Sequence, residues 1–216
     1  IEVVTAESTP CDDPSKFVFL ESEGVVKVEF ENAEFGNGWE LKVDNNKATG
    51  RGYMVWELAD YFSKPSSDLA TYNLRISTPG TYKFLWYSAV TQGNSGTEHN
   101  DTWLRFPDAE DYFAKKNNEI IYPKGTGKTP NPEGASADGW FKIYRSGNDF
   151  DFKWQARTSD GDPHEIYVTF SEAKTYRMQI SARSNGHGID KFVLFLESLN
   201  ESTVTNSAPF SEIICM

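Results

Sequence analysis

Three carboxylates near the two ends of the chain have the spacing of a cation site. Glu29 and Glu31 are two residues apart in a strand-like run, so both side chains point to one side. Two carboxylates held together repel each other unless a cation or water screens them. Asp190 precedes an apolar run, 191–196, that we expect to pack beside the first strand. Hard oxygen ligands favour calcium over zinc or copper. The sequence therefore predicts a calcium site, with a solvated acidic face as the alternative.

A second group of residues could contact a ligand. Thr102, Leu104 and Phe106 alternate in an expected strand and should face inward, which turns Trp103 outward. His99 and Asn100 would then stand at the mouth of that strand. An exposed Trp is costly to leave in water unless something covers it. We predict a binding surface here, unless the segment 108–139 folds over it.

The three histidines offer a different possibility. His99, His164 and His187 each lie in an expected loop beside an acidic residue, and three His could form a zinc site. Their spacing gives no sign that they converge, so three separate loop residues are the preferred interpretation.

Known catalytic motifs are absent from the sequence. The run 124–129, KGTGKT, has Tyr122 where a phosphate loop requires its first glycine. His164-Glu165 lacks the second His of a zinc protease, and no Ser or Cys nucleophile motif occurs. We predict a protein that is not an enzyme.

Charge and composition limit the classes of molecule that the protein can bind. The 216 residues carry a formal net charge of −11, which argues against nucleic acid and anionic membranes as partners. No apolar run approaches the ~20 residues of a membrane helix. The opening residues lack a signal pattern, so we expect a secreted protein whose export signal has been removed. Cys11 and Cys215 stand at opposite ends, and we predict a disulfide that joins them.

The elements that must position these residues are strands. Short runs with period-two alternation are separated by Gly, Pro, Asn and Asp throughout the chain. Only 108–116 is expected to be a short helix, and 122–139 is expected to be a long loop. The predicted fold is all-β: an antiparallel β-sandwich (jelly roll) with one long inserted loop. Residues 1–24 form a lead-in and residues 25–216 form the sandwich, within one domain.

Four short segments in this order resemble carbohydrate-binding modules of families 6 and 35. They are VEFENAEF (28–35), ATGRGYMVW (48–56), TPGTYKF (78–84) and GIDKFVLF (188–195). The resemblance spans roughly residues 25–197, and the segment 108–139 makes this chain longer than the family pattern.

The resemblance implies a function and a set of ligands. Its calcium is structural and ties the first and last strands together, with backbone carbonyls from 47–51 as further ligands. By position, Tyr53 and Trp140 would form the aromatic walls of a sugar cleft, and Asn185 and His187 would supply polar contacts. The expected function is noncatalytic polysaccharide binding by a monomer, linked to or partnered with a glycoside hydrolase or lyase.

Two other functions stay open. One is a small polysaccharide lyase or hydrolase that uses paired acids or the histidines. The other is a cell-surface adhesion domain, because fold alone does not fix function. Arg157 and Arg183 fall on the polar side of their strands, so they either contact an anionic sugar or pair with local carboxylates.

Overall fold

The alternating runs form short strands, as expected of half-buried β structure. The computed structural model describes residues 11–132 and 136–216. Residues 1–10 of the predicted lead-in and 133–135 of the predicted insertion therefore lie outside the described residues. The early elements are η1 (Pro14–Lys16), β1 (Phe17–Leu20), β2 (Val25–Glu29), β3 (Trp39–Lys42), β4 (Tyr53–Trp56), β5 (Leu69–Arg75), β6 (Gly80–Val90), β7 (Asp101–Arg105), β8 (Asp111–Lys116) and β9 (Glu119–Ile121). The later ones are β10 (Ser136–Ala137), β11 (Trp140–Tyr144), β12 (Lys153–Trp154), β13 (Arg157–Thr158), β14 (His164–Phe170), β15 (Thr175–Ser181), β16 (His187–Leu196), α1 (Glu201–Ser207) and β17 (Ile213–Cys215).

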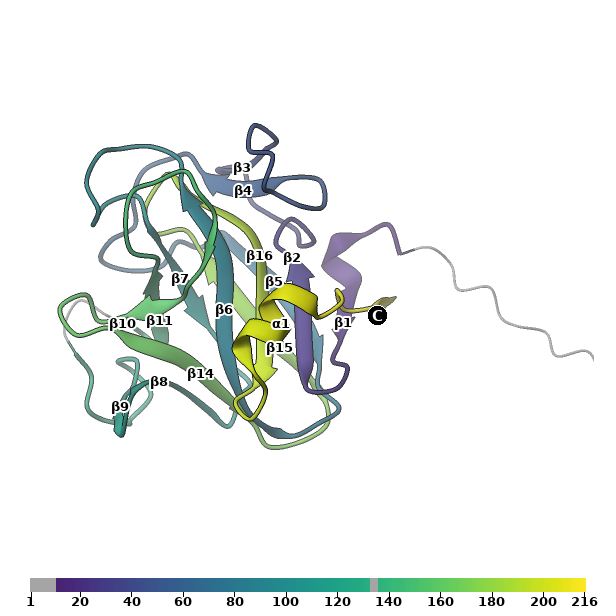
Figure 1. Cartoon of the computed structure of the whole chain (residues 1–216). Coiled ribbons are helices and arrows are strands. Elements are labelled where there is room, and N and C mark those ends of the chain that lie inside the picture. The colour runs from purple at the N-terminus through teal and green to yellow at the C-terminus, as the bar shows by residue number, and fades with distance from the viewer. Residues whose placement is uncertain (1–10, 133–135) are drawn as a thin grey trace, which may run out of the picture.

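The strands pair into two layers of a curled sheet (Figure 1). One layer runs β2–β16–β6–β14–β8, with every pair antiparallel. The other runs β1–β5–β15–β7–β11. The short strand β13 pairs with both β11 and β14 and so joins the two layers at one edge. The predicted all-β sandwich is confirmed.

One pairing departs from the antiparallel prediction. β1 lies parallel to β5, with Val18 opposite Asn73. Parallel neighbours require a crossover, and here the chain passes through β2, β3 and β4 before it returns in β5. The sandwich is therefore mixed at this edge.

Aromatic side chains fill the space between the layers. The Tyr72 ring on β5 lies 5.0 Å from the Phe192 ring on β16, and Tyr176 on β15 lies 4.6 Å from Phe170 on β14. All four side chains are almost completely buried. Burying one such side chain stabilises the fold by about 1.5–3 kcal/mol relative to leaving it exposed. The core therefore holds both layers together.

The predicted helix at 108–116 is wrong, because residues 111–116 form β8 against β14. Tyr112 and Ala114 are buried while Phe113 and Lys115 are partly exposed, which is a strand period and not a helical one. The described helix is α1, where the Asn200 side chain accepts a hydrogen bond from the Thr203 amide at 3.0 Å. Asn200 thus acts as a helix N-cap.

The two ends of the described chain are joined covalently. Cys11 and Cys215 form the predicted disulfide, with their Cα atoms 5.6 Å apart. β17 pairs with β1, and Phe17 lies opposite Cys215. In the part of the chain that the structure describes, no helix is long and apolar enough to cross a membrane.

Candidate functional site

Glu29, Glu31 and Asp190 come together under the loop 47–51, and we call these three carboxylates the acidic cradle. β16 pairs with β2 so that Lys191 lies opposite Glu29, which brings Asp190 beside the end of β2. The Thr49 amide donates to Asp190 Oδ1 at 2.8 Å, and the Thr49 hydroxyl donates to Glu29 Oε2 at 2.9 Å. One short loop therefore contacts carboxylates from both strands.

The cradle is electrostatically unfavourable as it stands. The pKa of Glu29 is raised to about 7, mainly by burial and to a smaller degree by the charges of Asp190 and Glu31, while the Thr49 hydrogen bond and the Lys191 charge oppose the shift. Burial is also the main cause that raises the pKa of Glu31 and of Asp190. Each shift means that the charged form is disfavoured. A cation among the carboxylates would relieve this cost.

The residues of the cradle fit a hard divalent cation. Glu31 Oε2 is buried and has no hydrogen-bond partner among the described residues. Lys191 Nζ lies 2.9 Å from Asp190 Oδ2, and Arg51 also acts on Glu31, so two positive charges face three negative ones. Oxygen ligands with residual negative charge are what calcium prefers.

The three carboxylates each accept a hydrogen bond from the loop: Asp190 and Glu31 from backbone amides, and Glu29 from the Thr49 hydroxyl. The Arg51 amide donates to Glu31 Oε1 at 2.7 Å. Among the described residues, the acidic group whose ligand atoms all lie within 4.8 Å of one another is a different one, formed by Glu119, Asp162 and His164. An ion bound by all three carboxylates of the cradle would therefore require their oxygen atoms to move closer together.

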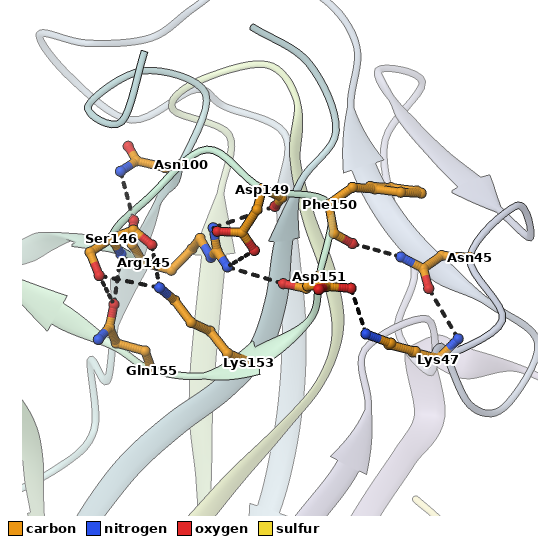
Figure 2. A network of polar contacts seen from close by, with 10 residues as sticks. All are labelled: Asn45, Lys47, Asn100, Arg145, Ser146, Asp149, Phe150, Asp151, Lys153 and Gln155. Carbon is orange, nitrogen blue, oxygen red and sulfur yellow. Dashed lines mark hydrogen bonds and ion pairs between the residues drawn. The ribbon is translucent and has the colours of Figure 1, made fainter. Parts of the chain in front are cut away.

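A groove lies beside the cradle on the same loop. It has a volume of about 520 Å³ and is lined by Asp44–Lys47 and Asp149–Asp151; we call it the loop groove. The Asn45 side-chain amide donates to the Phe150 carbonyl at 2.8 Å, and Lys47 pairs with Asp151 at 2.5 Å (Figure 2). The Phe150 side chain is 40% exposed. An exposed ring among amides and carboxylates is a surface suited to a polyhydroxylated ligand.

A buried arginine fixes one wall of the loop groove. Arg145 is fully buried, and its guanidinium donates to the Asp149 carboxylate at 2.9 and 3.2 Å and to the Asp151 carbonyl at 3.0 Å (Figure 2). The Asn100 side chain donates to the Arg145 carbonyl at 2.7 Å. Since a bidentate pair holds both partners in one geometry, the loop that carries Phe150 is preorganised.

Tyr53 lies beneath the loop groove. Its ring contacts Phe150 at 6.1 Å and Phe152 at 5.2 Å, and its hydroxyl donates to Asp44 at 2.6 Å. The side chain is 1% exposed. Tyr53 therefore supports the groove from inside, and the ring that faces solvent is Phe150, which sequence reasoning missed.

The expected binding surface around Trp103 has no exposed indole, because Trp103 is covered, although by the loop that carries Tyr61 and not by the segment 108–139 proposed as the alternative. Trp103 is 2% exposed, its indole N–H donates to the Tyr61 carbonyl at 2.8 Å, and Arg183 stacks 5.2 Å from its ring. The loop after β4 thus supplies cover, and the carbonyl that it provides satisfies the indole. Trp140 is also buried, with Arg105 4.4 Å from its ring. Neither Trp offers an exposed face for a sugar.

The polar residues predicted to bind sugar are divided between the surface and the interior. His99 Nδ1 donates to Asn185 Oδ1 at 2.7 Å, and Gln92 donates to the same oxygen at 2.7 Å. These three side chains form a partly exposed cluster. Asn100 is buried against Arg145, as described above.

His187 is fully buried and contacts the Thr102 hydroxyl at 2.8 Å. Burial, followed by the Arg145 charge, lowers the pKa of His187 to about 3, so the ring is neutral. Each of the three histidines has its own separate partners.

Of the two arginines that could have indicated an anionic sugar, Arg183 forms an ion pair with Asp101. The pairing alternative is thus confirmed for Arg183. Among the described residues no carboxylate forms an ion pair with Arg157, so neither alternative is decided for it.

Comparisons with known proteins give structural likeness only. No family model and no curated protein matches the chain. The fold is similar to a β-(1,4)-mannanase of Podospora anserina that contains a family 35 carbohydrate-binding module, with 16% identity, a TM-score of 0.48 and 83% of this chain covered. It is also similar to an isomaltodextranase of Arthrobacter globiformis, with 13% identity, a TM-score of 0.46 and 81% of this chain covered. The chain spans only 29% and 24% of those two proteins.

A third similar structure is an isolated module. It is a family 35 carbohydrate-binding module of Clostridium thermocellum, with 13% identity and a TM-score of 0.45; 80% of this chain and 98% of that one are covered. At such identities and TM-scores the likeness does not identify what this chain binds.

Proposed function

We propose that this chain binds carbohydrate noncatalytically through the loop groove. The observation that carries the proposal is the half-exposed Phe150 ring, set among Asn45, Asn46 and Lys47 on one side and Asp149 and Asp151 on the other. Sugars present apolar C–H faces and a rim of hydroxyls, which an aromatic plane and nearby amides or carboxylates can contact together.

The charges of the loop groove favour a neutral sugar over a uronate. Of the three acidic residues that line the groove, Asp151 is paired with Lys47 and Asp149 with the buried Arg145, which leaves the charge of Asp44 without a cationic partner among the described residues. An anionic ligand would meet net repulsion here, whereas hydroxyl groups can donate to the carboxylates.

We further propose that calcium binds in the acidic cradle and has a structural role. Glu29, Glu31 and Asp190 would hold the ion, and the raised pKa values, the unpartnered Glu31 oxygen and the covering loop support this assignment. Because the same loop, 43–52, lines the groove through Asp44–Lys47 and covers the cradle through 49–51, an ion in the cradle would also stiffen the groove.

An enzyme is the less favoured function. The carboxylates with raised pKa are not among the residues that line the loop groove, which argues against their acting on a ligand held there. The histidines also lie apart, as described above. The chain is therefore proposed as a secreted, monomeric binding module, linked to or partnered with a glycoside hydrolase or lyase, and the disulfide fits an oxidising compartment.

Affinity electrophoresis against a panel of neutral and anionic polysaccharides tests this proposal. We expect retardation on at least one neutral polysaccharide, and Phe150→Ala should abolish it. Phe210→Ala removes a comparably exposed ring (44%) outside the groove and should leave retardation unchanged.

Two outcomes would contradict the proposal. One is the absence of retardation on every polysaccharide. The other is that Phe150→Ala is retarded as strongly as the wild type. If His99→Ala loses the retardation instead, the binding site lies at the cluster of Gln92, His99 and Asn185. Release of reducing ends or unsaturated products would identify an enzyme.

A further inference from the structure

Glu119, Asp162 and His164 form a cluster that the proposed function does not use. Glu119 begins β9, His164 begins β14, and Asp162 lies in the turn before β14. One ligand atom from each residue lies within 4.8 Å of the others. The β8–β9 hairpin lies at the end of the sandwich away from β3 and β4, which flank the loop of the cradle and groove (Figure 1). The cluster is therefore separate from both.

The hydrogen bonds of His164 leave a ligand nitrogen free. His164 Nδ1 lies 2.6 Å from the Asp162 carbonyl oxygen. A carbonyl only accepts, so Nδ1 must carry the proton, and in the neutral ring Nε2 then holds a lone pair. The His164 side chain is 1% exposed, and Nε2 has no hydrogen-bond partner among the described residues. A buried, unpaired nitrogen of this kind is unusual.

The carboxylate that faces this lone pair is itself an acceptor. Glu119 Oε2 lies 4.0 Å from His164 Nε2, too far for a hydrogen bond. Nδ1 bonded to a backbone carbonyl is the arrangement that orients metal-binding histidines. A cation between Nε2 and the Glu119 carboxylate would satisfy both groups.

We propose that Glu119, Asp162 and His164 form a binding site for a divalent transition metal of the zinc class. Zinc lies about 2.0–2.2 Å from nitrogen and oxygen ligands, so two ligands of a tetrahedral site stand roughly 3.3–3.5 Å apart. The Glu119 side chain is 59% exposed and can close the remaining gap. An imidazole with two carboxylates suits zinc better than calcium, so this site differs in chemistry from the acidic cradle.

Lys116 is a positively charged side chain that faces the cluster. Its ammonium group pairs with Asp162 Oδ1 and also acts on Glu119, so it occupies the position of a competing cation. Zinc binding must weaken this pair. Removing the Lys116 charge should therefore strengthen zinc binding, a result that a merely structural cluster would not give.

Calorimetric titration with zinc chloride in excess calcium tests the proposal, because calcium would occupy the site proposed in the acidic cradle beforehand. We expect one bound zinc ion per chain. The zinc affinity should fall about tenfold or more in Glu119→Gln and rise in Lys116→Gln. Glu172→Gln removes an exposed, lysine-paired carboxylate elsewhere and should bind zinc like the wild type.

Imidazole nitrogen NMR supplies a second readout that does not depend on a variant. Zinc should shift the His164 Nε2 signal and leave the signals of the partly exposed His99 unchanged. The proposal is overturned if the protein takes up no zinc, if Glu119→Gln binds zinc as tightly as the wild type, or if His164 Nε2 does not respond.

Discussion

Gly50 fixes how the covering loop lies over the acidic cradle. Its φ is +60°, and a Cβ atom there would stand 2.3 Å from Glu31 Oε1. A left-handed backbone conformation costs a non-glycine residue about 1–2 kcal/mol. We expect Gly50→Ala to lower the free energy of unfolding by that amount plus about 1 kcal/mol for the contact with Glu31, and to weaken calcium binding.

Gly127→Ala is the matched control. Gly127 also has a left-handed φ, +77°, but nothing lies within 4 Å of its Cβ position. Urea denaturation should show the smaller loss for Gly127→Ala, with calcium affinity unchanged. Equal losses for the two variants would show that Gly50 is not crowded by the cradle.

His187 should make the protein sensitive to acid. Its pKa is lowered from 6.5 to about 3 in the folded state, so the unfolded chain binds the additional proton between these values. Stability must therefore fall as the pH decreases from about 6.5 toward 3. Arg145 is the charged group that acts on the ring and adds to this effect.

Thermal denaturation as a function of pH measures this effect. In His187→Gln the decline of the melting temperature over the same pH range should be shallower, whatever the variant's absolute stability. A slope identical to that of the wild type would exclude His187 as its cause.

At the residue scale, sequence reasoning found the carboxylates but not the aromatic ring. Residues two apart in a strand point to the same face, so the proximity of Glu29 and Glu31 could be predicted from their spacing. The exposure of Phe150, Trp103 and Trp140 depends on which loops cover them, and Tyr61 and Arg105 are distant in sequence from the rings they cover.

The loop 145–151 is the element that shapes the candidate site. Its conformation rests on the Arg145–Asp149 pair, in which the arginine is fully buried. Hydrogen bonds to a charged group contribute about 1.5–3 kcal/mol. We expect Asp149→Asn to destabilise the protein by about 1–2 kcal/mol, because the half-exposed Asp149 carboxylate is partly screened by solvent, and to weaken carbohydrate binding.

Asp108→Asn provides the comparison at an exposed pair. Asp108 binds Arg177 on the surface, where ion pairs contribute about 0–1 kcal/mol. Chemical denaturation and affinity electrophoresis should therefore show a smaller effect of Asp108→Asn on both quantities. The reverse order would argue against a role for Arg145 in fixing the loop.

At the element scale, alternation predicted the strands that bury one face. It failed for β8, where the charged residues around Phe113 suggested a helix although Tyr112 and Ala114 kept the strand period. It also gave no sign of the Arg145 network, because hydrogen bonds from one side chain to several loop carbonyls leave no periodic pattern in a sequence.

At the scale of the whole molecule, one covalent link and one proposed metal site connect early segments of the chain to late ones. The Cys11–Cys215 disulfide joins positions 204 residues apart, and the proposed calcium joins β2 to β16. Removing a disulfide typically costs about 2–4 kcal/mol. We expect Cys11→Ser/Cys215→Ser and calcium chelation each to lower the melting temperature, and to do so together more than either alone.

Differential scanning calorimetry of the wild type and of the double cysteine variant, each with calcium and with EDTA, measures the contributions of the disulfide and of calcium to the melting temperature. Glu29→Gln should abolish most of the EDTA effect, whereas Glu172→Gln should retain it. A melting temperature that chelation leaves unchanged would show that the cradle holds no calcium.

The proposal that the loop groove binds carbohydrate is tested most directly by finding which residues a bound sugar perturbs. Once a neutral oligosaccharide ligand is in hand, amide chemical shifts recorded during its titration locate the contact. We predict that the largest changes fall on 44–47 and 149–151, around Phe150 and the loop groove. Changes concentrated on Gln92, His99 and Asn185, or on the strands away from the loops, would contradict the assignment of the groove as the binding site.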